Sequence, residues 1–197
     1  MEDRVVPVRE TRPVDSDVAG PDDAAAAAVL LHPHPHMGGD RFHPLVDGLH
    51  RRLPGEGVGA VRFDFASAEP REARDQVVAA IDRTAERWPD VPIVLVGYSF
   101  GAGVAAGVDD GRVVGWFLVA PQSGSLSASP LGTDPRPKVL LVPERDQFSP
   151  PGAVAVATDG WAATTLEELP GDHFLAASLG RIIDRCVEWI DWIAADR

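Results

Sequence analysis

Apolar positions along this chain alternate between short continuous runs and stripes with helical spacing. The continuous runs predict buried strands, and they occupy residues 24–31, 59–65, 91–98, 113–120, 138–142 and 164–169. The helical stripes occupy residues 42–53, 71–88, 100–108 and 175–194, with a shorter helix within 154–161. Strands that alternate with helices predict a mostly parallel sheet covered by helices on both faces, which is an α/β fold.

Three segments lack a strong pattern. Residues 5–9 alternate weakly, which predicts an edge strand, and residues 15–23 are polar and contain Gly20-Pro21, which predicts a loop. Residues 123–137 are rich in serine, proline and glycine and show no periodicity, so we expect a loop there as well. A lid could be inserted at this point, but the segment offers little material for one.

The central apolar run leads directly into Gly97-Tyr98-Ser99-Phe100-Gly101. Gly-x-Ser-x-Gly between a strand and a helix is the pattern of a nucleophile elbow, in which a sharp turn exposes the serine hydroxyl. The Phe100 amide, at the start of the next helix, is then available to an oxyanion. The alternative is a glycine-rich strand–helix turn of another α/β fold, in which Ser99 only caps the helix.

Two further candidates follow later strands. Asp146 comes just after the run at 138–142, and His173 comes just after the run at 164–169. Ligands of parallel sheets bind beyond the carboxyl ends of the strands, so these side chains should meet Ser99 at one edge. The order serine, acid, histidine along the chain is that of the α/β-hydrolase arrangement. Glu144 is the local rival for the acid.

A histidine-rich loop, residues 32–40, follows the first apolar run. We interpret it as an oxyanion loop whose second backbone amide comes from His36 or, as second choice, Met37. Metal binding is the alternative, since three histidines alternate here, but no carboxylate or further histidine follows at ligand spacing. We therefore predict no metal. His43 and His50 are expected on the solvated side of the next helix.

Composition narrows the classes of function. The chain has 197 residues, 45% apolar and 24% charged, and we expect one domain over residues 1–197. A net charge of −12 and a pI near 4.8 argue against nucleic acid and anionic membranes as partners. The lone cysteine, Cys186, excludes an internal disulfide, fits a reducing compartment and is expected to be buried. We see no signal peptide and no membrane-spanning run, so we predict a cytoplasmic protein.

Taken together, these motifs resemble the small, lid-poor α/β-hydrolases that are described as predicted esterases and are related to dienelactone hydrolases. The resemblance rests on His32-Pro33-His34-Pro35 with Gly38-Gly39, residues 61–65, the motif around Ser99, Asp146 with Pro150, and residues 171–174. It implies an α/β-hydrolase fold with minimal or no cap. The chain departs from the family after Phe65, where it is shorter and lacks the glycine- and arginine-containing turn common in the family. It also departs at Asp40 and Arg41, where small or hydroxyl residues are common. Dienelactone hydrolases proper have a cysteine at the position of Ser99, so their substrate is not carried over.

The resulting hypothesis is a serine hydrolase of small or short-chain acyl esters, within the carboxylic-ester hydrolases. Ser99, His173 and Asp146 would act through an acyl-enzyme, with the amides of Phe100 and His36 holding the oxyanion. Side chains that flank these residues are expected to line the substrate site, namely Met37, Phe42, Tyr98, Gln122, Phe148 and Phe174. No cofactor is predicted, the partner is a small-molecule acyl substrate, and the sequence makes no prediction of oligomeric state. The alternatives are a thioesterase or acyltransferase with the same triad, and a hydrolase-fold binding or regulatory protein.

Overall fold

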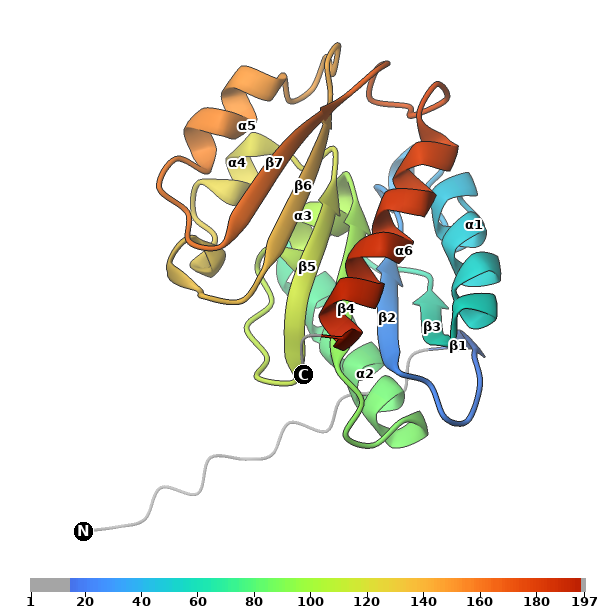
Figure 1. Cartoon of the computed structure of the whole chain (residues 1–197). Helices are drawn as coiled ribbons and strands as arrows, with labels where there is room; N and C mark the ends of the chain where they lie inside the picture. The colour runs from blue at the N-terminus through green and yellow to red at the C-terminus, as the bar shows by residue number, and fades with distance from the viewer. Residues whose placement is uncertain (1–14, 196–197) are drawn as a thin grey trace, which may run out of the picture.

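A seven-stranded sheet forms the centre of the molecule, in the order β1-β3-β2-β4-β5-β6-β7. The computed structural model describes residues 15–195, and the edge strand expected at residues 5–9 lies outside this part. The strands are β1 Ser16–Ala19, β2 Ala26–Leu31, β3 Val58–Phe63, β4 Ile93–Tyr98, β5 Val113–Val119, β6 Lys138–Pro143 and β7 Thr164–Leu169. Every neighbouring pair is parallel except β1 and β3, which are antiparallel (Figure 1). The predicted mostly parallel sheet is therefore confirmed.

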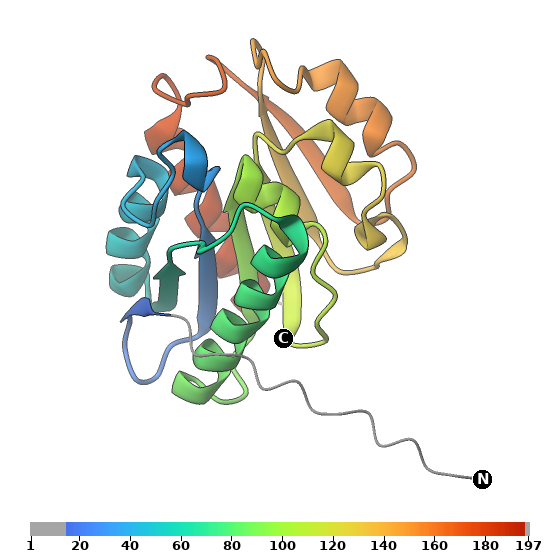
Figure 2. The same ribbon diagram turned by 180° about the vertical axis from the view of Figure 1, so that it is seen from behind.

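Helices cover both faces of the sheet. Helices α1 (Pro44–Arg52) and α6 (Leu179–Ala195) pack on one face, and their apolar side chains belong to one core cluster. The other face carries α2 (Pro70–Arg87), α3 (Phe100–Ala105), α4 (Ser123–Leu126) and α5 (Pro151–Ala157), which share the second core cluster. Figures 1 and 2 show these two layers from opposite sides. Three short 3₁₀ turns complete the fold, η1 Pro35–Met37, η2 Leu53–Glu56 and η3 Pro130–Thr133.

The continuous apolar runs explain the central strands. Every residue of β2, β3, β4, β5 and β6 is buried, because successive side chains point alternately into the two core clusters. The register pairs Leu31 of β2 with Gly97 of β4, and Gly97 with Leu118 of β5. The carboxyl ends of these three strands consequently lie at one edge, and the loops that follow them share that edge.

Three segments differ from the sequence expectation. The loop expected at residues 15–23 contains β1, whose residues are all only partly buried and pair with β3 alone. The loop expected at residues 123–137 contains α4 and η3, both too short to show a periodic pattern. Helix α6 begins at Leu179 and not at residue 175, because Leu175 adopts a positive φ of 65° that interrupts the helix. All three differences concern short or peripheral segments.

Cys186 confirms the expectation of a buried thiol. Its side chain is buried on the inner side of α6, among the residues that face the sheet. Burial also raises the pKa of this thiol far above its ordinary value. The group is therefore held as a neutral, apolar packing element.

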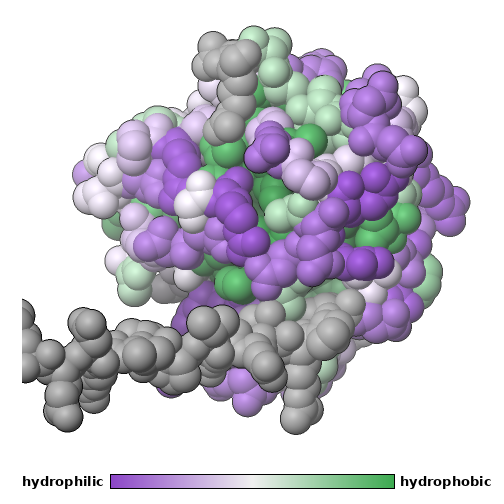
Figure 3. Space-filling view, turned by 90° about the horizontal axis from the view of Figure 1, so that it is seen from below, coloured by the Kyte–Doolittle hydropathy of each residue, from purple (hydrophilic) through white to green (hydrophobic). Residues whose placement is uncertain are grey.

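The surface at the amino ends of the strands is mostly hydrophilic, with smaller hydrophobic areas between the polar side chains (Figure 3). Among the described residues, we find no helix whose length and apolar character would allow it to cross a membrane.

Candidate active site

Ser99 occupies the sharp turn between β4 and α3. Its backbone angles, φ 53° and ψ −111°, are rarely adopted by a residue with a side chain. A Cβ on Gly97 would lie 2.6 Å from the Ala102 nitrogen, and one on Gly101 would lie 2.4 Å from the Leu31 carbonyl oxygen. Both glycines are thus required by close backbone packing, and the turn has the geometry of a nucleophile elbow.

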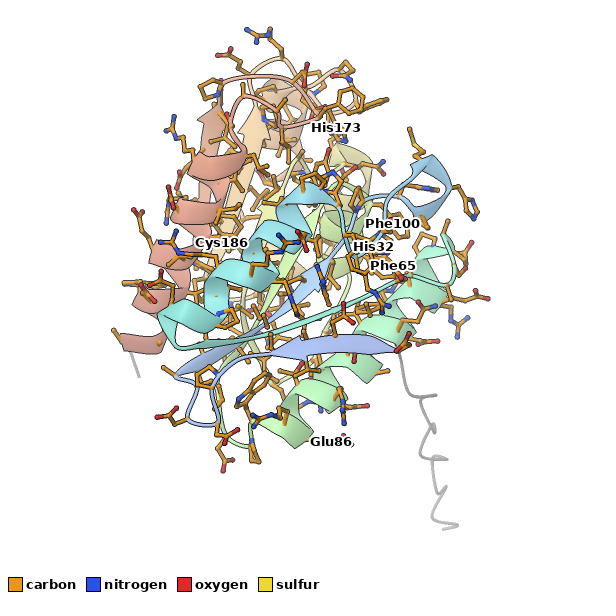
Figure 4. The ribbon with its side chains drawn as sticks, turned by 90° about the vertical axis from the view of Figure 1, so that its right-hand side faces the viewer. His32, Phe65, Glu86, Phe100, His173 and Cys186 are labelled. Atoms are coloured by element: carbon orange, nitrogen blue, oxygen red, sulfur yellow. The ribbon has the colours of Figure 1, made fainter. Side chains whose placement is uncertain are left out.

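The structure brings Ser99, His173 and Asp146 together in one chain of hydrogen bonds. His173 Nδ1 lies 2.7 Å from Asp146 Oδ2, and His173 Nε2 lies 2.9 Å from Ser99 Oγ. A carboxylate only accepts hydrogen bonds, so Nδ1 carries the proton and Nε2 is left to accept from the serine hydroxyl. Figure 4 shows His173 at the carboxyl edge of the sheet.

Asp146 is held in place by its own loop. Its side chain has no exposed surface, and its Oδ1 accepts the backbone N–H groups of Phe148 and Ser149, both at 2.9 Å. Glu144, the rival acid, is exposed and pairs with Arg145 at 2.9 Å. The geometry therefore favours Asp146 as the partner of the histidine.

Two backbone amides close to Ser99 in the fold make no hydrogen bond within the described part of the chain. Phe100 is the first residue of α3, so its N–H has no partner within the helix. The amides of His36 and Met37, which the sequence suggested as the second donor, point elsewhere: they donate to His34 Nδ1 at 3.2 Å and to the His34 carbonyl at 3.0 Å. In the described part of the chain the His34 N–H makes no hydrogen bond, and His34 lines the cavity.

Pro35 explains why the amides of His36 and Met37 are already hydrogen-bonded. Proline is favoured at the first position of a helical turn, and η1 begins there. The amides that follow it are drawn into the hydrogen bonds of the turn, while the amide of His34 just before it stays available. The proline is visible in the sequence, so this signal could have moved the expectation from His36 to His34.

His32 joins two strand ends through both of its ring nitrogens. Its Nε2 accepts the Phe65 N–H at 2.8 Å, and its Nδ1 donates to the Pro33 carbonyl at 2.6 Å. Burial lowers the pKa of this imidazole, which favours the neutral form that both bonds need. Its ring lies 4.8 Å from that of Phe65, and the Phe65 ring lies 5.3 Å from that of Phe100, measured between centroids (Figure 4). No group of three or more metal-ligand side chains occurs within residues 15–195.

A cavity of about 140 Å³ lies over Ser99 and His173. Five of the six side chains expected at the substrate site are among its walls, namely Met37, Tyr98, Gln122, Phe148 and Phe174. Phe42 is not. Phe42 is 57% exposed, and the central guanidinium carbon of Arg62 lies 4.7 Å from the centroid of its ring. The loop residues Pro33, His34, Gly38 and Gly39 and the helix-capping His43 complete the wall.

His43 differs from the solvated side chain that its helical position predicted. It is half-buried, its Nδ1 accepts the Leu45 N–H at 3.3 Å, and its ring lies 4.9 Å from that of Tyr98. Burial lowers its pKa, and it does the same for the half-buried His50. Periodicity describes only the regular part of a helix, so it could not show that the first turn of α1 packs against the end of β4.

Comparison with known proteins supports the fold. A model of the family described as bacterial virulence protein (VirJ) matches residues 49–108, which is less than half of the chain. None of the curated proteins is significantly similar in sequence.

Solved structures match over almost the whole chain. An α/β serine hydrolase homologue from Coxiella burnetii is 22% identical, with a TM-score of 0.78 over 88% of this chain and 89% of that one. A putative α/β hydrolase from Agrobacterium tumefaciens is 23% identical, with a TM-score of 0.80 over 89% of both chains. A serine hydrolase without a lid from Xanthomonas campestris is 20% identical, with a TM-score of 0.70 over 89% and 90%. Est1E from Butyrivibrio proteoclasticus also matches at 13% identity, and a cold-adapted esterase from an Arctic intertidal metagenomic library matches at 17%. The chain therefore has the α/β-hydrolase fold, in a form without a lid.

Proposed function

We propose that this protein is a serine hydrolase that cleaves small or short-chain acyl esters through an acyl-enzyme. The observation that carries the proposal is the unbroken hydrogen-bond chain from Asp146 through His173 to Ser99, which ends on the strained turn. A serine becomes a useful nucleophile when a base is within hydrogen-bond reach and a third group orients that base. The hydrogen bonds of His173 to Ser99 and to Asp146 support both conditions.

The first half of the reaction forms the acyl-enzyme. Ser99 Oγ attacks the acyl carbon, and its proton passes to His173 Nε2 as the new C–O bond forms. Asp146 stabilises the imidazolium that results. The tetrahedral intermediate then breaks its bond to the alcohol oxygen, and that oxygen takes the proton from Nε2.

The second half repeats the sequence with water. His173 accepts a proton from the attacking water, the hydroxide adds to the acyl carbon, and the Ser99 oxygen leaves with that proton. The negative oxygen in both halves is held by the Phe100 amide and, in this proposal, by the amide of His34. Donors fixed at the ends of β4 and β2 need no rearrangement when the charge develops.

The cavity supports a small acyl group. Its volume of about 140 Å³ lies below the 300–1,000 Å³ that is usual for drug-sized ligands. At about 30 Å³ per water-sized group, the space holds only a few carbon atoms beyond the ester itself. With no lid to enclose a longer chain, the protein should prefer acetate and butyrate esters to octanoate esters.

The test is hydrolysis of p-nitrophenyl esters from acetate to octanoate by the wild type and by Ser99→Ala. We expect kcat to fall at least about 10⁴-fold in the variant. Ser127→Ala is the matched control, because Ser127 is an exposed serine whose hydroxyl bonds to the Ser123 carbonyl outside the cavity. It should keep the wild-type rate.

Full activity of the Ser99→Ala variant would contradict the proposal. Failure of a fluorophosphonate probe to label Ser99 would instead favour a binding protein that retains the fold. Faster turnover of acyl-CoA than of matched oxygen esters would assign the triad to a thioesterase.

A further inference from the structure

Three strongly exposed hydrophobic side chains surround the opening of the cavity. Met37, Phe148 and Phe174 are 74%, 54% and 64% exposed, and all three line the cavity over Ser99. Apolar side chains that gather in the open at one place mark a surface that binds an apolar group. The question is which part of the substrate these side chains contact.

The two phenylalanines flank the histidine. The Phe148 ring lies edge-on to the His173 ring at 4.8 Å between centroids, and the Phe174 ring lies edge-on at 6.1 Å. Their backbones are fixed by neighbouring acids. Phe148 N–H donates to Asp146 Oδ1 at 2.9 Å, and Phe174 N–H donates to Asp172 Oδ1 at 3.1 Å. Both rings are thus held beside the base by their loops, and core packing does not cover them.

The chemistry of the proposed reaction assigns a substrate group to this position. The oxygen that leaves must lie within reach of His173 Nε2, because that atom delivers its proton. The alcohol part of the ester is therefore on the histidine side of the tetrahedral carbon. The acyl chain points along a different bond of the same carbon, away from the histidine.

We propose that Phe148 and Phe174 bind the leaving group, and that the natural substrates are esters of a small acid with an apolar, preferably aromatic, alcohol. This inference rests on the serine-hydrolase function proposed above. An aromatic leaving group can meet each exposed ring edge-on or offset, the two arrangements that aromatic pairs favour. Because no lid covers the rings, the alcohol can be much larger than the cavity.

The remaining walls fit a small, uncharged acyl group. Gly38 and Gly39 contribute no side chains, and a Cβ on Gly39 would lie 2.3 Å from the Pro33 carbonyl oxygen, so the loop is tightly closed on itself. Among the described residues that line the cavity, none is an arginine or a lysine. Neither the acyl part nor the alcohol part thus meets a cation that would select a carboxylate or a phosphate.

Two isomeric esters separate the two sides of the site. Benzyl acetate carries its ring on the alcohol, and methyl phenylacetate carries the same ring on the acid. We expect kcat/KM for benzyl acetate to exceed that for methyl phenylacetate by at least about fivefold, after each is divided by its rate of hydrolysis by hydroxide. Ethyl acetate, which has no ring, serves as the reference substrate.

Substitution of the rings tests the assignment directly. Phe148→Ala and Phe174→Ala should each lower kcat/KM for benzyl acetate about fivefold more than they lower kcat/KM for ethyl acetate. Phe42→Ala is the matched control, since Phe42 is 57% exposed but lies outside the cavity. It should change neither value.

The outcomes distinguish this inference from the function on which it rests. If kcat/KM is equal for the two isomers, or higher for methyl phenylacetate, the leaving-group assignment is overturned. The proposed serine-hydrolase function still holds in that case, provided that hydrolysis depends on Ser99. A loss on ethyl acetate as large as that on benzyl acetate also overturns it, because the rings would then only position His173. Hydrolysis that survives in Ser99→Ala, or no hydrolysis of any ester, overturns both.

Discussion

A carboxylate buried without exposed surface is costly unless its oxygens are bonded. Asp146 meets this condition with three hydrogen bonds: its Oδ1 accepts two backbone amides and its Oδ2 accepts His173 Nδ1–H. The two amides hold the carboxylate independently of the histidine. A change at this residue should therefore alter the histidine's tautomer more than the local fold.

Asp146→Asn should lower kcat by about 10⁴-fold, because an amide can donate to Nδ1 and so place the imidazole proton on Nε2, where it blocks acceptance from Ser99. Glu144→Gln is the control and should change kcat less than about twofold, since Glu144 is exposed. Ester hydrolysis and circular dichroism of both variants provide the measurement. If Asp146→Asn kept full activity and Glu144→Gln were inactive, the catalytic acid would be Glu144 and not Asp146.

At the scale of elements, Arg62 of β3 ties the edge of the sheet together. Its Nε donates to Asp17 Oδ2 in β1 at 3.0 Å, and its Nη1 donates to Asp47 Oδ1 in α1 at 2.8 Å. The same Nη1 donates to the Arg41 carbonyl at 3.1 Å, in the loop that leads to α1. The hydrogen bond from Arg62 also holds the pKa of the Asp47 carboxyl below its ordinary value.

Arg62→Met should lower the free energy of unfolding by about 2 kcal/mol. Asp17 and Asp47 lose the buried cation that joins them, but Asp17 keeps Arg41 and Asp47 keeps Arg51 as a partner. Arg51→Met is a matched control, since Arg51 pairs with the same Asp47 at 2.9 Å but is 77% exposed. It should cost less than about 1 kcal/mol. Urea unfolding of both variants measures the difference. Equal losses would show that the network does not hold β1 and α1 to the sheet.

The elements differ in how far the sequence predicts them. The central strands and long helices follow from patterns that extend over six or more residues, and the structure confirms them. The β1 strand could not be predicted in this way, because its four residues are held by pairing with β3 and by Arg62, at positions distant in sequence. Helix α4 depends similarly on a remote contact, the Ser149 hydroxyl that accepts the Ser123 N–H at 2.7 Å.

The candidate site also contains residues that the sequence predicts and residues that it does not. Ser99, Asp146 and His173 could be proposed from the sequence because each directly follows a strand, and parallel strands end at one edge. The position of His43 depends on how the start of α1 packs against the end of β4, which is a tertiary contact that no local spacing encodes. The choice between His36 and His34 as the second amide depends instead on the local turn that begins at Pro35.

For the molecule as a whole, three histidines couple stability to pH. Burial lowers the pKa of His32, His43 and His50 from the ordinary 6.5. As the pH falls below about 6.5, the unfolded chain binds more protons than the folded chain. The contribution of these neutral histidines to the free energy of unfolding is therefore present above that pH and is lost below it. Asp40 and Asp64 act in the opposite direction on His32, but burial dominates.

The free energy of unfolding should consequently be lower at pH 5.5 than at pH 7.5, by at most about 1.4 kcal/mol per pH unit for the buried His32. Urea unfolding at the two pH values provides the measurement. His32→Asn should reduce the slope with pH even if it also lowers stability overall. Greater stability at pH 5.5 than at pH 7.5 would contradict the assignment of these histidines as neutral.

The buried thiol on α6 has a practical consequence for following the motions of the protein. Cys186 is the only cysteine of the chain, and in the folded state its sulfur is covered and its pKa is raised. An alkylating reagent can therefore reach it only when α6 separates from the sheet. The rate of labelling, compared with that of the unfolded chain, reports the free energy of this opening. Alkylation of Cys186 thus measures the detachment of α6 from the sheet without an engineered label.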